Sequence, residues 1–348
     1  GEPAFYELIP ERDNHVHSYF TGVTSPTYKW SADNKTVTAA CVCSVCGETE
    51  TETVNTVVAS KDVTCTEAGT VTYTATFTNP AFEVQTKTEE IPAPGHSYAF
   101  TGWEWSEDGS SANALFTCRN NAAHVLRVEG TVTLVSSVAP SYSRSGEKVY
   151  TATAAYNGAS YTETKTVVLP ALALPFVDVQ DGDYFGAPVR WALDSEVTKG
   201  TDETHFSPGS NCTRAQIVTF LYRASGSPAV AQTNNPFVDV PGNAYYYNAV
   251  LWAVQKGITK GTDATHFSPD AVCTRAQAVT FLYRAADTPE TTSAGTLFAD
   301  VPSDAYYAPA VRWAVQEGIT LGTDATHFSP NSNCTRGHIV TFLYRFYQ

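Results

Sequence analysis

A short segment that recurs three times at one fixed spacing constrains this sequence most. NCTRAQIVTFLYR starts at Asn211, VCTRAQAVTFLYR at Val272 and NCTRGHIVTFLYR at Asn333. Other landmarks keep the same interval of 61 residues: Phe176, Phe237 and Phe298, Trp191, Trp252 and Trp313, and Cys212, Cys273 and Cys334. A register kept without insertions predicts three supersecondary units that pack against one another.

Each unit is predicted to contain two helices. In the second unit, AVLWAVQKG places Val250, Ala253 and Val254 on one helical face, and Gly257 suits the end of that helix. The repeated segment then begins the second helix.

The start of this second helix is specified by a capping box. Thr274 precedes it, and Gln277 follows three residues later. In the third unit Gly337 and His338 replace the Ala-Gln pair of the other two, so we expect that unit to lose its capping box and to gain a flexible residue.

The repeated cysteines and histidines are predicted to be structural. Three equivalent cysteines leave an odd number for disulfides, so we expect three small buried hydrophobic residues. His205, His266 and His327 recur in the turn sequence THFSP. A metal ion on the threefold set would need all three to converge, and no metal site is predicted there.

The first half of the chain carries a looser repeat of β character. HSYFTG at residues 17–22 matches HSYAFTG at residues 96–102. Thr alternates with Val, Tyr and Phe, and Asn157-Gly158 is a favoured pair for a two-residue hairpin turn. This pattern predicts small antiparallel, sandwich-like modules.

The predicted domains follow from the two repeats. We expect an N-terminal lead, two β modules and three helical units, with the boundary between the halves at Pro170–Pro175. The ranges are 1–16 for the lead, 17–95 and 96–174 for the modules, and 175–235, 236–296 and 297–348 for the units within 175–348.

The cysteines of the first module leave two readings open. CVCSVCGETE contains half of a zinc-ribbon knuckle, which Cys41, Cys65 and His17 could complete. A disulfide from Cys65 to Cys43 or Cys46 would suit a secreted domain equally well. The second module keeps only Cys118 and His124, so the fold does not require metal, and we predict no metal and no cofactor.

Composition and motifs exclude several functions. The net charge of −14 argues against non-specific nucleic-acid binding, and no apolar run is long enough to span a membrane. The chain has no Met, so Gly1 is expected to begin a processed or truncated product. No nucleophile elbow, paired-carboxylate set or phosphate loop is present, so no enzyme activity is predicted.

The helical units resemble a known family. The stretch FVDVPGNAYYYNAVLWAVQKGITKGTDATHFSPDAVCTRAQAVTFLYR is similar to the S-layer homology domain, which is marked by F-x-D-V, a Trp-Ala helix, a G-I-x-x-G loop, an F-x-P turn and a T-R-A-E helix start. The resemblance covers half of the chain. It implies a mainly α, pseudo-threefold assembly of the three units with grooves between them, after N-terminal all-β modules.

The resemblance also implies a function and a site. Such grooves bind secondary cell-wall polymers linked to peptidoglycan, often pyruvylated, and hold a secreted protein non-covalently on a Gram-positive-type cell surface. By this resemblance the ligand-binding residues are Arg214, Arg275, Arg336, Trp191, Trp252, Trp313, Gly200, Gly261, Gly322, Gln216 and Gln277. An Arg fork pairs with a carboxylate at two points, and free N–H groups at the helix start would add to the attraction.

Departures from the family pattern predict unequal grooves. Gln216 and Gln277 replace the Glu of T-R-A-E. Lys199 and Lys260 precede the loop glycine in two units, whereas the third has Leu321. We therefore expect the grooves that depend on the third unit's arginine to be weakest.

Other interpretations stay open from the sequence. The repeated Arg could be structural, bonding a neighbouring carbonyl or Asp178, Asp239 or Asp300. The β modules could bind a host protein or glycan through an aromatic patch around Trp103 and Trp105, although a core position is favoured for these two. The chain could also be the anchoring part of a larger surface enzyme, or could assemble into a surface lattice.

Overall fold

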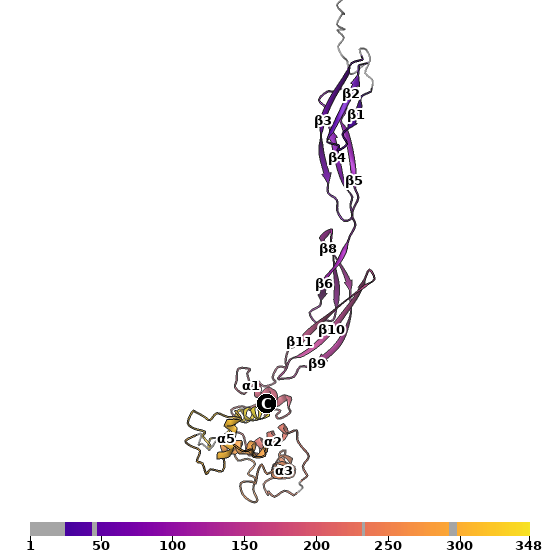
Figure 1. Cartoon of the computed structure of the whole chain (residues 1–348). Helices are drawn as coiled ribbons and strands as arrows, with labels where there is room; N and C mark the ends of the chain where they lie inside the picture. The colour runs from indigo at the N-terminus through magenta and orange to yellow at the C-terminus, as the bar shows by residue number, and fades with distance from the viewer. Residues whose placement is uncertain (1–24, 44–46, 232–233, 292–297) are drawn as a thin grey trace, which may run out of the picture. The chain divides into compact units, whose positions relative to one another are not determined.

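The computed structural model describes residues 25–43, 47–231, 234–291 and 298–348 (Figure 1). Two compact units divide the chain. The first comprises residues 1–106, 110–131 and 152–163, and the second comprises residues 107–109, 132–151 and 164–348. The all-β half and the mainly helical half are both confirmed, and the predicted module boundaries stay predictions.

One antiparallel sheet forms the first β module. Its strands are β1 (Thr27–Trp30), β2 (Thr36–Val42), β3 (Thr49–Lys61), β4 (Gly69–Ala75) and β5 (Gln85–Ile91), in the order β1-β2-β3-β4-β5. The long β3 pairs with β2 up to Asn55 and with β4 from Thr56 onward. Alternate residues of β2 face a small core around Ala39, Cys41 and Phe82, as period-two patterning requires.

Two three-stranded sheets follow. The first has the order β6-β7-β8, built from β6 (Tyr98–Trp105), β7 (Ala112–Cys118) and β8 (Asn121–Glu129). The second has the order β11-β10-β9, built from β9 (Thr131–Val138), β10 (Gly146–Tyr156) and β11 (Ala159–Leu169). Ala114 and Phe116 of β7 pack with Ala154 of β10, which gives the predicted sandwich-like core. Asn157 and Gly158 both have positive φ, as the predicted hairpin turn needs.

The helical half has threefold pseudosymmetry. Its helices are α1 (Gly186–Asp194), α2 (Arg214–Ala224), α3 (Tyr247–Gln255), α4 (Arg275–Ala285), α5 (Ala308–Gln316) and α6 (Arg336–Tyr347). Helices α2, α4 and α6 contact one another, while α3 packs on α2, α5 on α4 and α1 on α6. The last unit thus closes onto the first, and one apolar core runs through all three.

The repeated cysteines lie at the centre of this arrangement. The backbone N–H of Cys212 donates to the carbonyl of Cys334, that of Cys334 to Cys273, and that of Cys273 to Cys212, at 2.8–2.9 Å. All three side chains are fully buried, and burial raises the pKa of Cys212 and of Cys334 to about 12. The prediction of buried hydrophobic cysteines is confirmed.

The helix starts confirm two capping boxes and correct the third. Thr213 and Thr274 cap α2 and α4 with their Gln partners. Helix α6 keeps its box, against expectation: Nδ1 of His338 accepts from the backbone N–H of Thr335, and the hydroxyl of Thr335 accepts from the N–H of His338, both at 3.3 Å. The imidazole nitrogen takes the place of the Gln side-chain oxygen.

The ends of the first helices differ among the units. Gly257 and Gly318 follow α3 and α5 with φ of 70° and 68°, as a left-handed helix end requires. Glu196 follows α1 in the same conformation, with φ of 55°. Among the described helices, none is both long and apolar enough to cross a membrane.

Candidate binding grooves

Three equivalent grooves lie between the helical units. Groove 1 is lined by Thr198–Thr201, residues of α2, Tyr245 and Arg336, and has a volume of about 390 Å³. Groove 2 is lined by Thr259–Thr262, residues of α4, Tyr306 and Arg214, with about 310 Å³. Groove 3 is lined by Thr320–Thr323, residues 332–333, residues of α6, Tyr184 and Arg275, with about 490 Å³.

Each groove takes residues from all three units. One unit supplies the glycine loop and the second helix, the preceding unit supplies the Arg of the T-R motif, and the following unit supplies a Tyr. Because the third unit packs on the first, all three grooves have this same composition.

The T-R arginines are buried at the base of these grooves. Arg214, Arg275 and Arg336 are only 4–5% exposed. Each Nε–H donates to the carbonyl of a Phe in the next unit around the ring, at 2.8–2.9 Å. The interpretation that each arginine bonds a neighbouring backbone carbonyl is thus confirmed.

The alternative partner, the repeated Asp, is not used by the arginines. Both carboxylate oxygens of Asp178 accept backbone N–H groups, from Phe206 and Ser207 at 2.9 and 2.7 Å. Asp239 and Asp300 do the same in the other two units. These carboxylates therefore shape the F-x-P turn.

Each guanidinium lies between two phenylalanine rings. Arg214 lies 4.9 Å from the ring centre of Phe267 and 5.4 Å from that of Phe281. Arg275 and Arg336 have the same pair of rings, at 4.8–5.6 Å. Cation–π contact of this kind compensates in part for the loss of water.

Carboxylates offset the positive charge of these arginines only from beyond hydrogen-bonding distance among the described residues: Asp239 for Arg214, Asp300 for Arg275 and Asp178 for Arg336. Within the described ranges, none of the three forms an ion pair, and Nη2 of Arg214 and of Arg336 is buried without a hydrogen-bond partner. Nη2 of Arg275 donates to the Thr320 hydroxyl at 3.3 Å. Burial lowers the pKa of all three guanidinium groups.

The helix starts offer no free N–H groups, which corrects an expectation. The N–H of Arg214 donates to the carbonyl of Ala271 and that of Ala215 to Pro269, both at 2.9 Å. The corresponding groups of α4 and α6 are bonded in the same way. Neighbouring loops of the ring occupy these donors, so basic side chains and not the helix starts supply the positive charge of each groove.

The loop glycines line the grooves and are required by the backbone. Gly200, Gly261 and Gly322 have φ of 84–89°. A Cβ at Gly261 would lie 2.5 Å from the carbonyl oxygen of His266 and 2.5 Å from the ring of Phe237. No side chain fits there, so the loop backbone itself forms the groove wall.

The tryptophans lie away from the grooves. Trp252 and Trp313 are 5% and 4% exposed and pack against Tyr222 and Tyr283. Trp191 is half-buried against Tyr347. None of them is among the groove-lining residues, so these positions serve the core.

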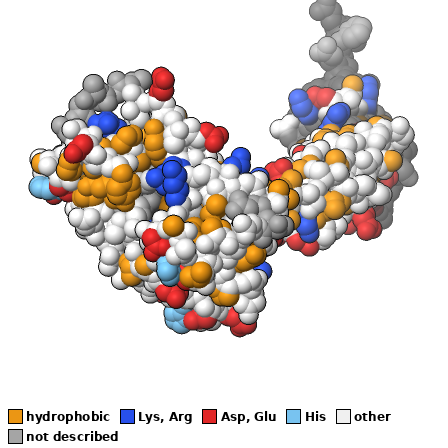
Figure 2. Space-filling view, turned by 90° about the horizontal axis from the view of Figure 1, so that it is seen from below, with side chains coloured by type: hydrophobic (Ala, Val, Ile, Leu, Met, Phe, Trp, Pro, Cys, Tyr) orange, Lys and Arg blue, Asp and Glu red, His pale blue; other side chains and the backbone are white. Residues whose placement is uncertain are grey.

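Two repeated groove residues were missed by the sequence interpretation. Tyr184, Tyr245 and Tyr306 are 57–63% exposed, each at one groove. Arg223, Arg284 and Arg345, from the F-L-Y-R end of the repeated segment, also line the grooves. The 61-residue interval could have found both sets. Figure 2 shows basic side chains beside hydrophobic ones on one face of the helical half.

The three grooves differ in their lining residues, and Leu321 shares a groove with Arg275, not with Arg336. Grooves 1 and 2 contain Lys199 and Lys260, with Gln216 and Gln277 at their helix starts. Groove 3 contains Leu321 and His338, and it is built on Arg275. The expectation that Arg336 serves the weakest groove rested on Arg336 sharing a groove with Leu321 and His338. Each arginine instead reaches into the groove of the next unit, so Arg336 lies with Lys199 in groove 1.

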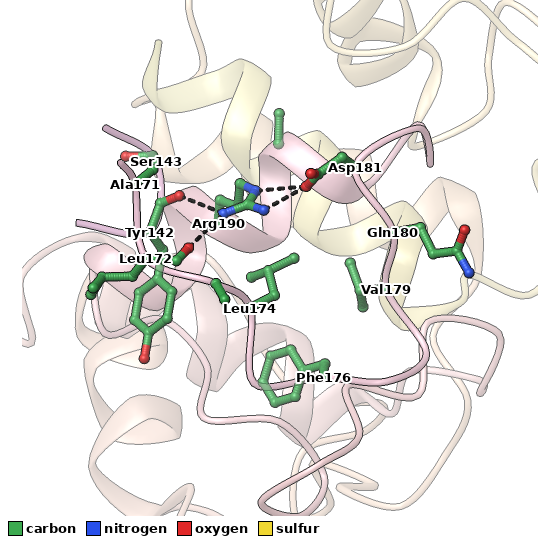
Figure 3. A pocket seen from close by; sticks show the side chains of 12 residues that line it. Tyr142, Ser143, Ala171, Leu172, Leu174, Phe176, Val179, Gln180, Asp181 and Arg190 are labelled. Carbon is green, nitrogen blue, oxygen red and sulfur yellow. Dashed lines mark hydrogen bonds and ion pairs between the residues drawn. The ribbon is translucent and has the colours of Figure 1, made fainter. Parts of the chain in front are cut away.

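A larger cavity of about 740 Å³ offers a contrast (Figure 3). Its Arg190 donates to the carbonyls of Tyr142 and Leu172 at 2.8 and 3.0 Å and pairs with Asp181 at 2.5 Å. Asp194 of α1 accepts from the N–H groups of Tyr142 and Ser143 in the same region, both at 2.8 Å. These charges are satisfied within the chain, so the cavity marks where the loop after β9 packs on α1.

The cysteines proposed for a site in the first module lie at opposite ends of β3. Cys41 pairs with Glu50 at its start, whereas Cys65 follows its last residue, Lys61. Thirteen residues of strand span roughly 40 Å. Cys65 therefore cannot share a disulfide or a metal with Cys41 or Cys43, and His17 and Cys46 lie outside the described residues.

The remaining sequence candidates have ordinary structural roles. His205, His266 and His327 are about half exposed, and each bonds the Asp three residues before it at 3.0–3.1 Å. Trp103 packs on the core of the second β module, and Trp105 donates to Glu163 at 2.7 Å. These contacts do not support an aromatic binding patch.

Comparison with known proteins identifies the helical units. The sequence profile of the S-layer homology domain matches residues 175–218, 236–279 and 297–339. Each match spans the opening Phe, the first helix, the glycine loop and the start of the second helix of one unit. The glycine loop and the arginine of each groove lie within these ranges.

Relatives share this region. The surface-layer 125 kDa protein of Lysinibacillus sphaericus is 31% identical over 159 residues, 44% of this chain and 13% of the relative. An S-layer protein of Bacillus thuringiensis subsp. finitimus is 27% identical over 183 residues, 51% and 22% respectively. An endoglucanase of Bacillus sp. (strain KSM-635) is 30% identical over 178 residues, 47% and 18%.

The chain spans less than a quarter of the length of each of these relatives. The matches indicate a cell-surface location, and they include no catalytic family. The chain therefore contains three S-layer homology domains, which follow the β modules.

Proposed function

We propose that grooves 1, 2 and 3 bind a carboxylate-bearing secondary cell-wall polymer, such as a pyruvylated glycan, and so hold this chain non-covalently on the cell wall. The β modules would serve as a stalk or presentation segment. No catalysis is involved.

The buried, unpaired arginine carries this proposal. A buried cation without an ion-pair partner is costly, and an anionic ligand would reduce that cost. A planar guanidinium can bond a carboxylate through two N–H groups, and charge-assisted bonds of this type are roughly twice as strong as neutral ones. The free Nη2 groups of Arg214 and Arg336 are the donors available for it.

The rest of each groove suits a sugar. The exposed Tyr at the rim offers an apolar ring face, while Thr hydroxyl groups and the loop backbone offer hydrogen-bonding groups. Lys199 and Lys260 add a second cation near the arginine of the preceding unit. Groove 3 has Leu321 in that place, and the Nη2 group of Arg275 is partly satisfied by Thr320, so it would bind most weakly.

Co-sedimentation with purified cell-wall sacculi tests this function. Wild-type protein should sediment with intact sacculi and stay in solution after acid removes the wall polymer. Lys199→Leu with Lys260→Leu should weaken binding by about tenfold, the loss of one charged contact per groove. Both lysines are exposed, so the fold should tolerate the change.

The matched variant is Leu321→Lys, which gives groove 3 the lysine of the other two. It should bind as well as wild type or better. Equal sedimentation with stripped sacculi would contradict the proposal, as would binding that is indifferent to all three substitutions.

A second candidate is that this chain anchors a catalytic domain of a larger surface enzyme. The similarity to an endoglucanase over 47% of the chain favours it. The grooves would act in the same way, and the length of the natural gene product would decide.

A further inference from the structure

Two cysteines and two histidines come together where the first β module meets the second. Cys65 lies in the loop between β3 and β4, His96 lies just before β6, Cys118 ends β7 and His124 belongs to β8. All four belong to the first compact unit. None of them takes part in the grooves.

The distances among these side chains suit a shared metal ion. Ligand atoms of Cys65, His96 and His124 all lie within 4.8 Å of one another. Sγ of Cys65 lies 3.9 Å from Sγ of Cys118. Two thiolates on one tetrahedral zinc ion are about 3.8 Å apart, since each Zn–S bond is about 2.3 Å, whereas the sulfurs of a disulfide are about 2.05 Å apart.

The surroundings support coordination. Nδ1 of His124 is buried and has no hydrogen-bond partner among the described residues. Backbone N–H groups of Ser97, Asn120 and Asn121 and the ring of His96 are directed at the sulfur of Cys118. N–H groups directed at a sulfur stabilise its thiolate, which is the form that binds metal.

We propose that Cys65, His96, Cys118 and His124 form a Cys2His2 site for Zn²⁺ that links the loop after β3 to the second β module. Two sulfur and two imidazole ligands in tetrahedral arrangement select zinc over harder cations such as Mg²⁺ or Ca²⁺. With four protein ligands the site is closed, so its role is structural.

Neither β module contains the whole site, because its four ligands come from both modules. Taken alone, the second module offers one cysteine, Cys118, beside His96 and His124. The missing cysteine comes from the first module, and His96 precedes the first strand of the second. At the position of Cys65 in its own repeat the second module has Tyr142, so this copy does not offer the site again.

Metal content of the full-length, reduced protein tests the proposal. After incubation with ZnCl₂ and gel filtration, the wild type should retain a zinc ion that Cys65→Ser and His124→Ala lose. Cys43→Ser is the matched control. Cys43 stands 13 residues after Trp30, as Cys118 does after Trp105. It lies near the start of β3, however, whereas Cys65 follows the end of that strand. This variant should keep the same zinc ion.

A cobalt titration decides the matter without relying on the folding of a variant. Co²⁺ added to the wild type should give the visible absorption of a tetrahedral site with two thiolate ligands, and Zn²⁺ should displace it. The proposal fails if the reduced wild type shows no such spectrum, or if Cys65→Ser retains as much zinc as the wild type. It also fails if mass spectrometry finds a Cys65–Cys118 disulfide and the reduced protein binds no metal.

Discussion

The helical half and the β modules both consist of repeats, but they build their sites from them in different ways. In the helical half the 61-residue interval is kept, and each groove takes equivalent residues from all three units. In the β modules the repeat has drifted, and among their described residues the four-residue cluster occurs once, across a junction. A strict repeat multiplies a site, whereas a drifted repeat can leave a single copy.

The largest expected effect tests whether the two regions are energetically separate. Phe206 of the helical half and Phe116 of the second β module are both almost fully buried. Phe206→Ala and Phe116→Ala should each cost about 3–5 kcal/mol of local stability, because each leaves a cavity. Hydrogen exchange followed by mass spectrometry should show faster exchange in the helical half alone for the first, and in residues 98–129 and 152–163 alone for the second. Faster exchange in both regions from either change would break the comparison.

A smaller effect separates two kinds of glycine. Gly261→Ala should cost about 3 kcal/mol, since φ is positive and the new Cβ would meet a carbonyl and a ring at 2.5 Å. Gly158→Ala in the β hairpin should cost only about 1 kcal/mol, because the space around it is open. Denaturant unfolding of both variants measures the difference. Equal costs would mean that the groove loop is not held as tightly as its contacts imply.

A stabilising change makes the first unit more like its neighbours. Glu196→Gly should raise stability by about 1 kcal/mol, because Glu196 adopts the left-handed conformation that glycine supplies in the other units. Gly257→Ala is the reciprocal change and should lose a similar amount, since nothing lies near its Cβ position. Thermal unfolding would show the opposite shifts, and shifts of the same sign would contradict this reading of the helix ends.

The smallest effect is a pH dependence that belongs to the third unit. Burial, with a smaller contribution from Arg275, lowers the pKa of His338 below its ordinary value of 6.5. The unfolded chain then binds the proton more readily, so this contribution to stability is complete above pH 6.5 and declines as the pH falls through that value. His338→Gln, the residue type of the other two units, should abolish this decline. Parallel stability curves for the two proteins below pH 6.5 would refute it.

Features set within one repeat could be predicted from the sequence, whereas features that depend on contacts between repeats could not. The helical units, the capping boxes of α2 and α4 and the buried cysteines follow from periodicity and local chemistry, and the resemblance pointed to the arginines. The capping role of His338 was missed because imidazole is not a usual partner in that box. The occupied N–H groups at the helix starts were missed because their acceptors, such as Ala271, belong to the next unit.

Residues joined only by tertiary packing were the hardest to predict. The pairing of Arg275 with Leu321 depends on which unit follows which around the ring. The meeting of Cys65 with Cys118 depends on β3 carrying the chain roughly 40 Å away from Cys41. Spacing within one repeat does not contain this information.

The central claim is that the buried arginines bind the wall polymer, and the thermal shift caused by purified polymer tests it most directly. Saturating polymer should raise the unfolding temperature of the wild type, as a ligand of the folded state does. The double variant Arg214→Ala, Arg336→Ala should lose most of that shift, while Arg214→Lys, Arg336→Lys should keep part of it, since Lys retains the charge without the fork. A full shift in the alanine variant would show that the arginines only support the fold.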